Sequence, residues 1–364
     1  MTSPEDRIKE IEEEIRRTPY NKATQGHVGR LKARLAKLRE DSAKPKGPQA
    51  ARGVRKSGDA TVAIVGFPSV GKSTLLNRIT EARSKVGSYD FTTLRAVPGL
   101  LSHRGARIQL LDLPGIARGA AGGRGRGREV LSHVRIADLL VLMIDVAQRD
   151  LGILLAELSA AGIRVNEDPP RVLLRRRDRG GIEVSFTVRQ RELEEEAIKE
   201  VLKEWGIANA ELVVRDDLTL DQLVDSLAGN RVYVPGIVVL NKVDLVPGEE
   251  VARIVQELGD WVVLPTSAKE GSGLKQLLEA IYSRLSLMRV YLRPPGRNVD
   301  TGEPLVVREG ARVRDVCTLL HGDFLRNFRH AQVWGPSAKF PGQTVGIDHR
   351  LEDGDTVTIV ARGG

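Results

Sequence analysis

The sequence is poor in cysteine and contains no apolar stretch long enough to cross a membrane. Cys317 is the single cysteine among 364 residues, so no disulfide can form within the chain. Apolar runs such as 139–144 fall far short of the roughly 20 residues that a membrane-spanning helix needs. No leader with a charged and then an apolar segment opens the chain. We therefore expect a cytoplasmic protein with no membrane partner.

Two chemical patterns are missing as well. The six histidines are scattered without the spacing of a metal site, and no Ser-His-Asp arrangement is recognisable. A histidine-based metal centre and triad hydrolysis are therefore not expected. Cys317 falls on the apolar side of a predicted helix, which indicates a small buried side chain.

Positive charge is present in excess and is unevenly distributed. The chain carries a net charge of +8, yet residues 16–58 alone contain thirteen Lys or Arg against Glu40 and Asp41, a local net charge of +11. This concentration predicts a polyanionic partner, with RNA favoured over DNA or a membrane. A solvated basic helical arm is the alternative interpretation.

The length and a hydrophobic content of 41% predict two or three domains. Apolar residues recur at helical spacing over residues 5–17 and again from Val28 to Leu38, with a proline-containing break between them. Residues 1–58 are therefore predicted to form a basic helical hairpin and a linker.

A nucleotide-binding α/β fold is predicted for residues 59–288. A strand, a glycine-rich loop and a helix begin at Thr61, and the buried-strand candidates that follow predict a mostly parallel sheet with helices on both faces. The rhythm breaks over about 164–235, where a basic segment, a strand and two helices, one capped by Thr219, indicate an inserted α+β domain. The further buried-strand candidates are residues 107–111, 139–144, 237–240 and 261–264.

The last part of the chain, residues 289–364, changes character again. Short β-rich pieces surround one helix around 313–320, and the turn Asp353-Gly354 precedes the final strand. This pattern is typical of a β-grasp module.

The strongest chemical motif is Gly66-Phe-Pro-Ser-Val-Gly71-Lys72-Ser73, which fits the P-loop pattern. Its glycines let backbone N–H groups turn toward phosphate oxygens, and the next helix offers its positive end. Lys72 is predicted to reach the β- and γ-phosphates, and the Ser73 hydroxyl to coordinate Mg²⁺. The predicted phosphate-binding residues are Gly66, Phe67, Pro68, Ser69, Val70, Gly71, Lys72, Ser73 and Thr74.

Two later motifs select guanine. Asn241-Lys242-Val243-Asp244 ends an apolar strand, and the Asp244 carboxylate can accept hydrogen bonds from the guanine N1–H and exocyclic amine, which adenine does not offer together. Thr266-Ser267-Ala268-Lys269 follows the next strand and would complete the base pocket through backbone N–H groups. The predicted base-binding residues are Asn241, Lys242, Asp244, Ser267, Ala268 and Lys269.

Two segments have the pattern of nucleotide-sensing switches. Asp112-Leu-Pro-Gly115 ends a strand, so Asp112 is expected to hold Mg²⁺ through water and the Gly115 N–H to sense the γ-phosphate. Phe91, Thr92 and Thr93 lie after the first helix of the fold, with Thr93 the predicted Mg²⁺ ligand and Thr92 the alternative. The predicted catalytic residues are Lys72, Thr93 and Gly115, and the predicted metal ligands are Ser73, Thr93 and Asp112.

One expected catalytic residue is missing. Ile116 stands where many small GTPases place a glutamine that orients the attacking water, so slow unassisted hydrolysis is expected. The segment Arg118–Arg128 is rich in glycine and arginine. It is either a switch that orders on a partner, with an arginine near the transferring phosphate or on RNA, or a flexible solvated loop.

These motifs together resemble the developmentally regulated GTP-binding proteins, the DRG family of Obg-like translation-factor GTPases. The resemblance covers nearly the whole chain and is carried by HVGRLKARLAKLRE, GFPSVGKSTLLN, YDFTTL, DLPGIARGAAGGRGRGREVLS, GNRVYVPGIVVLNKVD and VGIDHRLEDGDTVTIV. It implies a C-terminal TGS domain, Mg²⁺-dependent GTP hydrolysis and ribosome association. An aliphatic residue at Ile116 agrees with the family.

The resemblance also bears on cofactors and partners. Some members are stimulated by K⁺, but Ser69 stands where several K⁺-activated GTPases carry asparagine, which leaves K⁺ dependence open. Eukaryotic members bind a stabilising partner protein. The preferred hypothesis is a GTP-hydrolysing switch on ribosomes or RNA in translation, with the basic hairpin and the TGS module contacting RNA. The alternative is a nucleotide-gated RNA-binding or assembly module whose hydrolysis is incidental.

Overall fold

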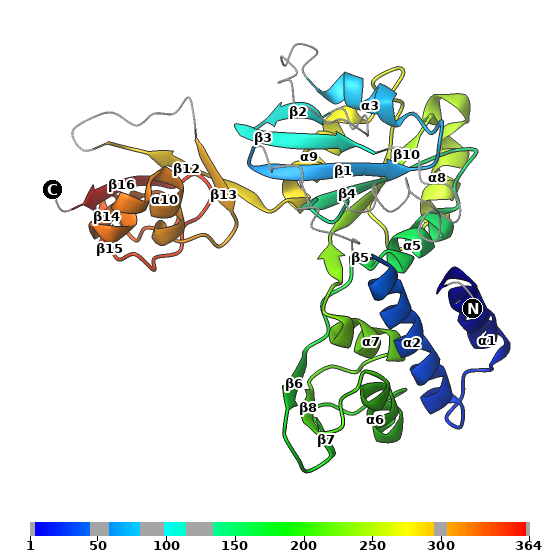
Figure 1. Ribbon diagram of the computed structural model, residues 1–364. Coiled ribbons are helices and arrows are strands. Elements are labelled where there is room, and N and C mark those ends of the chain that lie inside the picture. Colours follow the sequence, from blue (N-terminus) through cyan, green and yellow to red (C-terminus); the bar gives the residue numbers. More distant parts are fainter. Residues whose placement is uncertain (1–3, 44–57, 81–97, 114–133, 295–303, 362–364) are drawn as a thin grey trace. The chain divides into compact units, whose positions relative to one another are not determined.

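The computed structural model describes residues 4–43, 58–80, 98–113, 134–294 and 304–361. The described chain divides into two compact units (Figure 1). One contains the N-terminal helices and the segment 158–234, and the other contains the remaining described residues. None of the helices in the described ranges is both long enough and apolar enough to cross a membrane.

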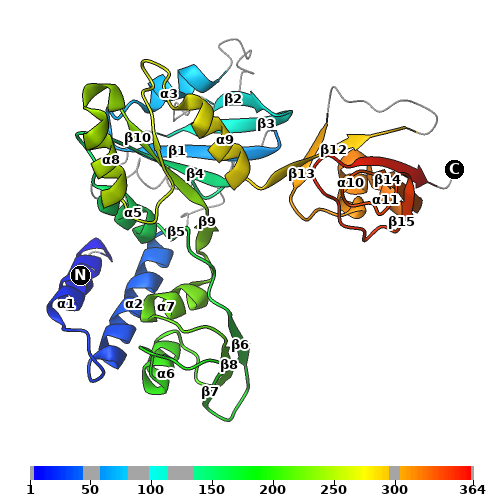
Figure 2. The ribbon, with the colours of Figure 1, turned by 180° about the vertical axis from the view of Figure 1, so that it is seen from behind.

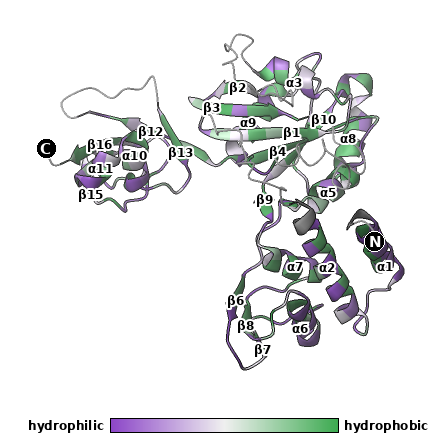
Figure 3. Cartoon of the chain, in the orientation of Figure 1, coloured by the Kyte–Doolittle hydropathy of each residue, from purple (hydrophilic) through white to green (hydrophobic). Residues whose placement is uncertain are grey.

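A six-stranded sheet forms the centre of the larger unit, in the order β11-β10-β4-β1-β3-β2. The first five strands in that order are parallel to their neighbours, and only β2 runs antiparallel, which confirms the predicted fold class. Every residue of β1, β4 and β10 is buried, so these strands are continuous apolar runs in the sequence (Figure 3). The strands are β1 (Ala60–Gly66), β2 (Pro98–His103), β3 (Ala106–Asp112), β4 (Leu139–Asp145), β10 (Gly236–Asn241) and β11 (Val263–Pro265).

Helices connect these strands and complete the core. Leu75 and Ile79 of α3 and Leu277 and Ile281 of α9 share one buried cluster with the sheet. Both helices present aliphatic residues three and four positions apart, which places these side chains on one face. The helical elements of this domain are α3 (Lys72–Ile79), α5 (Leu151–Ala160), the one-turn 3₁₀ helix η1 (Val243–Leu245), α8 (Gly248–Glu257) and α9 (Leu274–Arg284).

Two details of the sheet differ from the sequence prediction. Strand β11 begins at Val263, two residues later than predicted. Strand β2 was not predicted, because its sequence PGLLSH lacks an alternating or continuous apolar pattern. It pairs with β3 through a two-residue turn in which Arg104 and Gly105 have φ values of 50° and 82°, the left-handed pair that a tight hairpin requires.

The second unit joins the N-terminal helices to the inserted segment. Helix α2 packs on α6 and α7, and Val28 and Ala33 share a buried core with Val201 and Leu223 (Figure 2). Gly29 allows the close approach, because a Cβ there would lie 2.9 Å from a methyl group of Val201. The elements of this unit are α1 (Pro4–Arg17), α2 (Gln25–Ala43), β5 (Ile163–Val165), β6 (Val172–Arg176), β7 (Ile182–Phe186), α6 (Glu195–Glu204), β8 (Ala210–Val214), α7 (Leu220–Ala228) and β9 (Val232–Val234).

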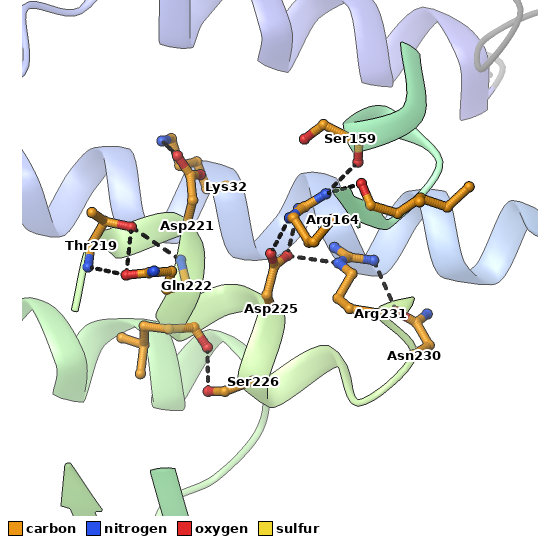
Figure 4. Close-up of polar contacts among 12 residues, drawn as sticks. Lys32, Ser159, Arg164, Thr219, Asp221, Gln222, Asp225, Ser226, Asn230 and Arg231 are labelled. Carbon is orange, nitrogen blue, oxygen red and sulfur yellow. Dashed lines mark hydrogen bonds and ion pairs between the residues drawn. The ribbon is translucent and has the colours of Figure 1, made fainter. Parts of the chain in front are cut away.

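A buried carboxylate holds the two ends of the inserted segment together. Strands β5 and β9, which begin and end that segment, pair in parallel. Asp225 on α7 is 5% exposed and accepts hydrogen bonds from Arg164 Nε at 2.6 Å and Arg231 Nε at 2.6 Å (Figure 4). Thr219 caps α7, as the sequence predicted, and it also forms a reciprocal capping box with Gln222.

The C-terminal module is a five-stranded sheet in the order β13-β12-β16-β14-β15 with one helix packed on it. Its first strand, β12, and its last, β16, are parallel neighbours in the middle of the sheet, as in a β-grasp fold. Cys317 on α10 is fully buried, as predicted. The elements are β12 (Leu287–Leu292), β13 (Leu305–Arg308), α10 (Val313–Leu320), α11 (Gly322–Arg326), β14 (Phe328–Trp334), β15 (Gln343–Val345) and β16 (Thr356–Ala361).

Candidate functional site

The predicted site residues that the structure describes follow the carboxyl ends of four parallel strands. The loop 66–71 leaves β1, Asp112 ends β3, the segment 241–244 leaves β10, and 266–269 follows β11. Because these strands are parallel, their carboxyl ends meet at one edge of the sheet, where open α/β folds bind ligands. The fold thus brings together residues separated by up to two hundred positions in the sequence.

The loop between β1 and α3 is shaped to hold an anion. Ser69 and Gly71 adopt left-handed conformations, with φ values of 64° and 99°. Gly66 admits no side chain, because a Cβ there would lie 2.3 Å from the carbonyl oxygen of Met143. Helix α3 begins at Lys72 with neither a side-chain cap nor an acidic residue in its first turn. The N–H groups of its first turn therefore have no capping side chain, and the helix contributes no carboxylate of its own at its positive end.

Lys72 is a buried cation held by neutral partners. Its side chain is 8% exposed, and Nζ donates to the carbonyl oxygens of Phe67 at 2.7 Å and Gly66 at 3.2 Å. Burial lowers the pKa of the Lys72 ammonium, an effect that the nearby carboxylate of Asp112 partly opposes. An anionic group in the loop would compensate this charge directly.

Ser73 and Asp112 present two oxygen ligands side by side. The Ser73 hydroxyl donates to Asp112 Oδ2 at 2.7 Å, which joins the first turn of α3 to the end of β3. A hydroxyl and a carboxylate beside a phosphate-binding loop are the hard oxygen donors that Mg²⁺ prefers. The residues present therefore fit this ion.

Asn241 connects the phosphate loop to the segment after β11. It is 2% exposed, its Nδ2 donates to the Val70 carbonyl oxygen at 2.8 Å, and its Oδ1 accepts from the Ala268 N–H at 2.9 Å. Gly71 must be a glycine here, since a Cβ would lie 2.4 Å from Asn241 Nδ2. The sequence assigned Asn241 to ligand binding, whereas the structure places both ends of its amide in contacts within the protein.

Asp145 is a residue of the site that the sequence reading missed. It ends β4, is 2% exposed, and its Oδ1 accepts from the backbone N–H groups of Ala147 and Gln148. Its Oδ2 forms an ion pair with Lys242 Nζ at 2.6 Å, while Lys242 holds a left-handed conformation with φ of 61°. The available signal was an aspartate that ends a fully apolar strand, at the sheet edge that the motifs share.

The base-recognition segments differ in exposure. Asp244 is exposed on η1, whereas Ser267 is fully buried and its hydroxyl accepts from the Glu270 N–H at 3.1 Å. The Lys269 carbonyl oxygen accepts a hydrogen bond from Arg78 on α3. The backbone of the segment 267–270 is thus held by hydrogen bonds from Arg78 and to the Ser267 hydroxyl, whereas the Asp244 carboxylate is exposed.

Several predicted residues lie outside the described part of the chain. These are Phe91, Thr92, Thr93 and Gly115, together with Ile116 and the segment 118–128.

Three family models match the chain. Residues 61–176 match a model described as a 50S ribosome-binding GTPase, and residues 179–287 match the C-terminal region of that domain. Residues 288–361 match the TGS domain.

Full-length relatives are similar to this chain. An uncharacterized GTP-binding protein of Methanocaldococcus jannaschii is 53% identical, over 98% of this chain and 93% of the relative. The developmentally-regulated GTP-binding protein 1 of Xenopus laevis is 44% identical, over 98% of each chain. Among solved structures, the YchF GTPase of Schizosaccharomyces pombe is 16% identical with a TM-score of 0.49, over 85% of this chain and 100% of that one.

Proposed function

This chain belongs to the family of developmentally regulated GTP-binding proteins, and from that premise we propose that it is a GTP-hydrolysing switch that acts on ribosomes or RNA in translation. It is a GTP-binding GTPase with a C-terminal TGS domain. One observation carries the proposal: an uncapped helix, a buried lysine and an exposed aspartate meet at a single edge of the parallel sheet.

The phosphate half of the proposed site is the loop 66–74. The backbone N–H groups of the loop and the side chain of Lys72 bind the phosphates, which supply the negative charge that this buried ammonium lacks. Ser73 and Asp112 would hold Mg²⁺, which, when bound, neutralises charge on the phosphate oxygens. Their hydroxyl–carboxylate contact of 2.7 Å supports this role, because it holds both oxygens at one point.

The base half of the proposed site depends on Asp244. Its carboxylate accepts from the guanine N1–H and exocyclic amine, while the N–H groups of 267–269 contact the base from the neighbouring loop. Asn241 supports this arrangement, because its side-chain amide bonds both Val70 of the phosphate loop and Ala268 of the base-binding segment. We therefore expect the contacts to the base and to the phosphates to depend on one another. Asp145 positions Lys242 through their ion pair.

The switch and its rate follow from the segments around Thr93 and Gly115. We expect the γ-phosphate to hold these two residues in place and hydrolysis to release them. Because Ile116 replaces a water-orienting glutamine, unassisted turnover is slow and a partner raises it. K⁺ is a candidate activator, and a comparison of turnover in KCl and NaCl tests it.

A ribosomal partner is supported by the matched GTPase model, whose description names ribosome binding. Turnover measured with and without ribosomes tests this part. Stimulation by tens-fold or more, a small part of the roughly 10³–10⁵ that partner activation can reach, supports a GTPase cycle. Equal turnover with and without ribosomes favours the alternative, a nucleotide-gated RNA-binding or assembly module with incidental hydrolysis.

Nucleotide selectivity tests the core of the proposal. Calorimetric titration with GTP and with ATP, each with Mg²⁺, is expected to give binding for GTP only. Because a site built to pair with guanine rejects a base lacking those donors by about 10⁴ or more, equal affinities for both nucleotides would refute the proposed site.

A further inference from the structure

Most of the positively charged side chains of the N-terminal helices form ion pairs within the protein. Eight Lys or Arg side chains lie among the described residues 16–43, and six of them form ion pairs. Four of the six reach acids of the inserted segment, as Lys32 does to Asp221 at 2.8 Å (Figure 4). The four pairs are Lys22–Glu194, Arg30–Glu200, Lys32–Asp221 and Arg34–Glu204.

A different surface in the same unit carries positive charge that these ion pairs do not reach. The inserted segment forms a three-stranded sheet in the order β6-β8-β7. One face is buried: Ala210, Leu212 and Val214 of β8 lie in the core with α6 and α7. Side chains directly opposite each other on neighbouring strands point to the same face of the sheet. The register with β8 therefore shows which residues of β6 and β7 face the core and which face away from it.

The opposite face is open among the described residues. Leu173 of β6 pairs in register with Val213 of β8, which pairs with Ser185 of β7, so these three side chains cross the sheet in one row. Leu173 is 38% exposed, and Ser185 is exposed as well. Arg175 lies two residues from Leu173 on β6, Arg215 lies one residue beyond the end of β8 and two from Val213, and both are exposed. The open face therefore carries Leu173 and Val213 beside Ser185, with Arg215 on one side of this row and Arg175, opposite Glu211, on the other.

The acids of this sheet do not neutralise those arginines. Glu183 and Glu211 both form ion pairs with Arg177, at 3.0 and 2.8 Å, and Asp216 accepts a hydrogen bond from Arg171. Among the described residues, five exposed arginines of the sheet and its loops have no acidic partner. They are Arg175, Arg176, Arg179, Arg189 and Arg215.

We propose that this open sheet face binds the sugar-phosphate backbone of RNA, with Arg175 and Arg215 on phosphates and the row formed by Leu173, Val213 and Ser185 against the sugars and bases. The planar guanidinium group pairs with phosphate through two hydrogen bonds, and uncompensated cations on a surface supply the electrostatic part of nucleic-acid affinity. The inference rests on the proposed association with RNA, and it assigns the contact to the inserted segment rather than to the N-terminal hairpin.

The test compares two triple variants of the full chain. Arg175→Gln, Arg179→Gln and Arg215→Gln remove three unpaired cations of the sheet and its loops. Lys22→Gln, Arg30→Gln and Arg34→Gln remove three paired cations of the hairpin. The probe is a fluorescein-labelled synthetic RNA stem-loop, titrated by anisotropy between about 50 and 200 mM salt. GTP affinity is measured for each variant, so that a failure of the nucleotide site is detected separately.

The sheet variant is expected to bind the stem-loop about tenfold or more weakly. Its plot of log affinity against log salt becomes shallower by about 2 to 3, since each phosphate contact contributes about 0.7–0.9 to the slope. The hairpin variant, which loses the same charge, is expected to stay within about twofold of the unmodified chain, because its cations are already paired.

Three results would overturn the inference. The first is an unmodified chain that binds GTP but not the stem-loop, and the second is a hairpin variant weakened as much as the sheet variant. The third is a sheet variant that keeps RNA affinity but loses binding to a labelled polyglutamate peptide, which would assign the face to an acidic protein.

Discussion

Removal of the Asn241 side chain should loosen the whole nucleotide site. Asn241→Ala leaves the Val70 carbonyl oxygen and the Ala268 N–H without their partner, and both residues are at most 2% exposed. An unsatisfied buried polar group costs about 1–3 kcal/mol, so the two together cost about 2–6 kcal/mol. If half of this cost falls on the nucleotide complex, affinity drops by a factor of about 5 to 150.

The assay is stopped-flow release of a fluorescent GDP analogue, together with thermal unfolding. Faster release is expected, since the phosphate loop and the loop carrying Ala268 no longer hold one another. The control is Asn209→Ala in the inserted segment, which removes the hydrogen bond that Asn209 Oδ1 accepts from the Gly181 N–H and should leave release unchanged. An Asn241→Ala protein that folds normally and releases the nucleotide at the original rate would disprove the idea that Asn241 holds the two loops together for nucleotide binding.

Four other outcomes are expected. Because burial lowers the pKa of Lys72, GTP affinity should weaken as pH rises through that lowered pKa, at a pH below the ordinary lysine value; constant affinity across alkaline pH would contradict this. Asp145→Asn removes the charge that holds Lys242, so GTP affinity should fall about 5- to 100-fold in calorimetry with little change in unfolding temperature; unchanged affinity would count against the positioning role. Asp225→Ala should lower the free energy of unfolding of the inserted segment by about 3–5 kcal/mol in urea, because Arg164 and Arg231 lose their buried carboxylate partner. A decrease below about 1 kcal/mol would show that these ion pairs contribute little to stability. Asp244→Asn should shift preference from guanine to xanthine nucleotides in competition binding, and retained guanine selectivity would refute its assignment.

The sequence determined the local parts of this protein. A fully buried strand must be apolar throughout, so β1, β4 and β10 were recognisable as continuous runs. The phosphate loop was recognisable for a related reason, because its close backbone approach at Gly66 and the left-handed φ at Gly71 can be met by little else than glycine. Each of these requirements acts within a few residues, so the amino-acid pattern records it directly.

Tertiary structure decided which distant groups meet. Asp145 lies 97 positions from Lys242, and neither residue's neighbours reveal the pair until parallel strands bring their ends to one edge. The partners of charged residues were likewise decided by tertiary structure. Positive charge is concentrated before residue 58 in the sequence, yet within the described residues 4–43 ion pairs such as Arg34–Glu204 compensate much of it. A count of charges along a chain contains no information about partners, because electrostatic energy depends on distance in space.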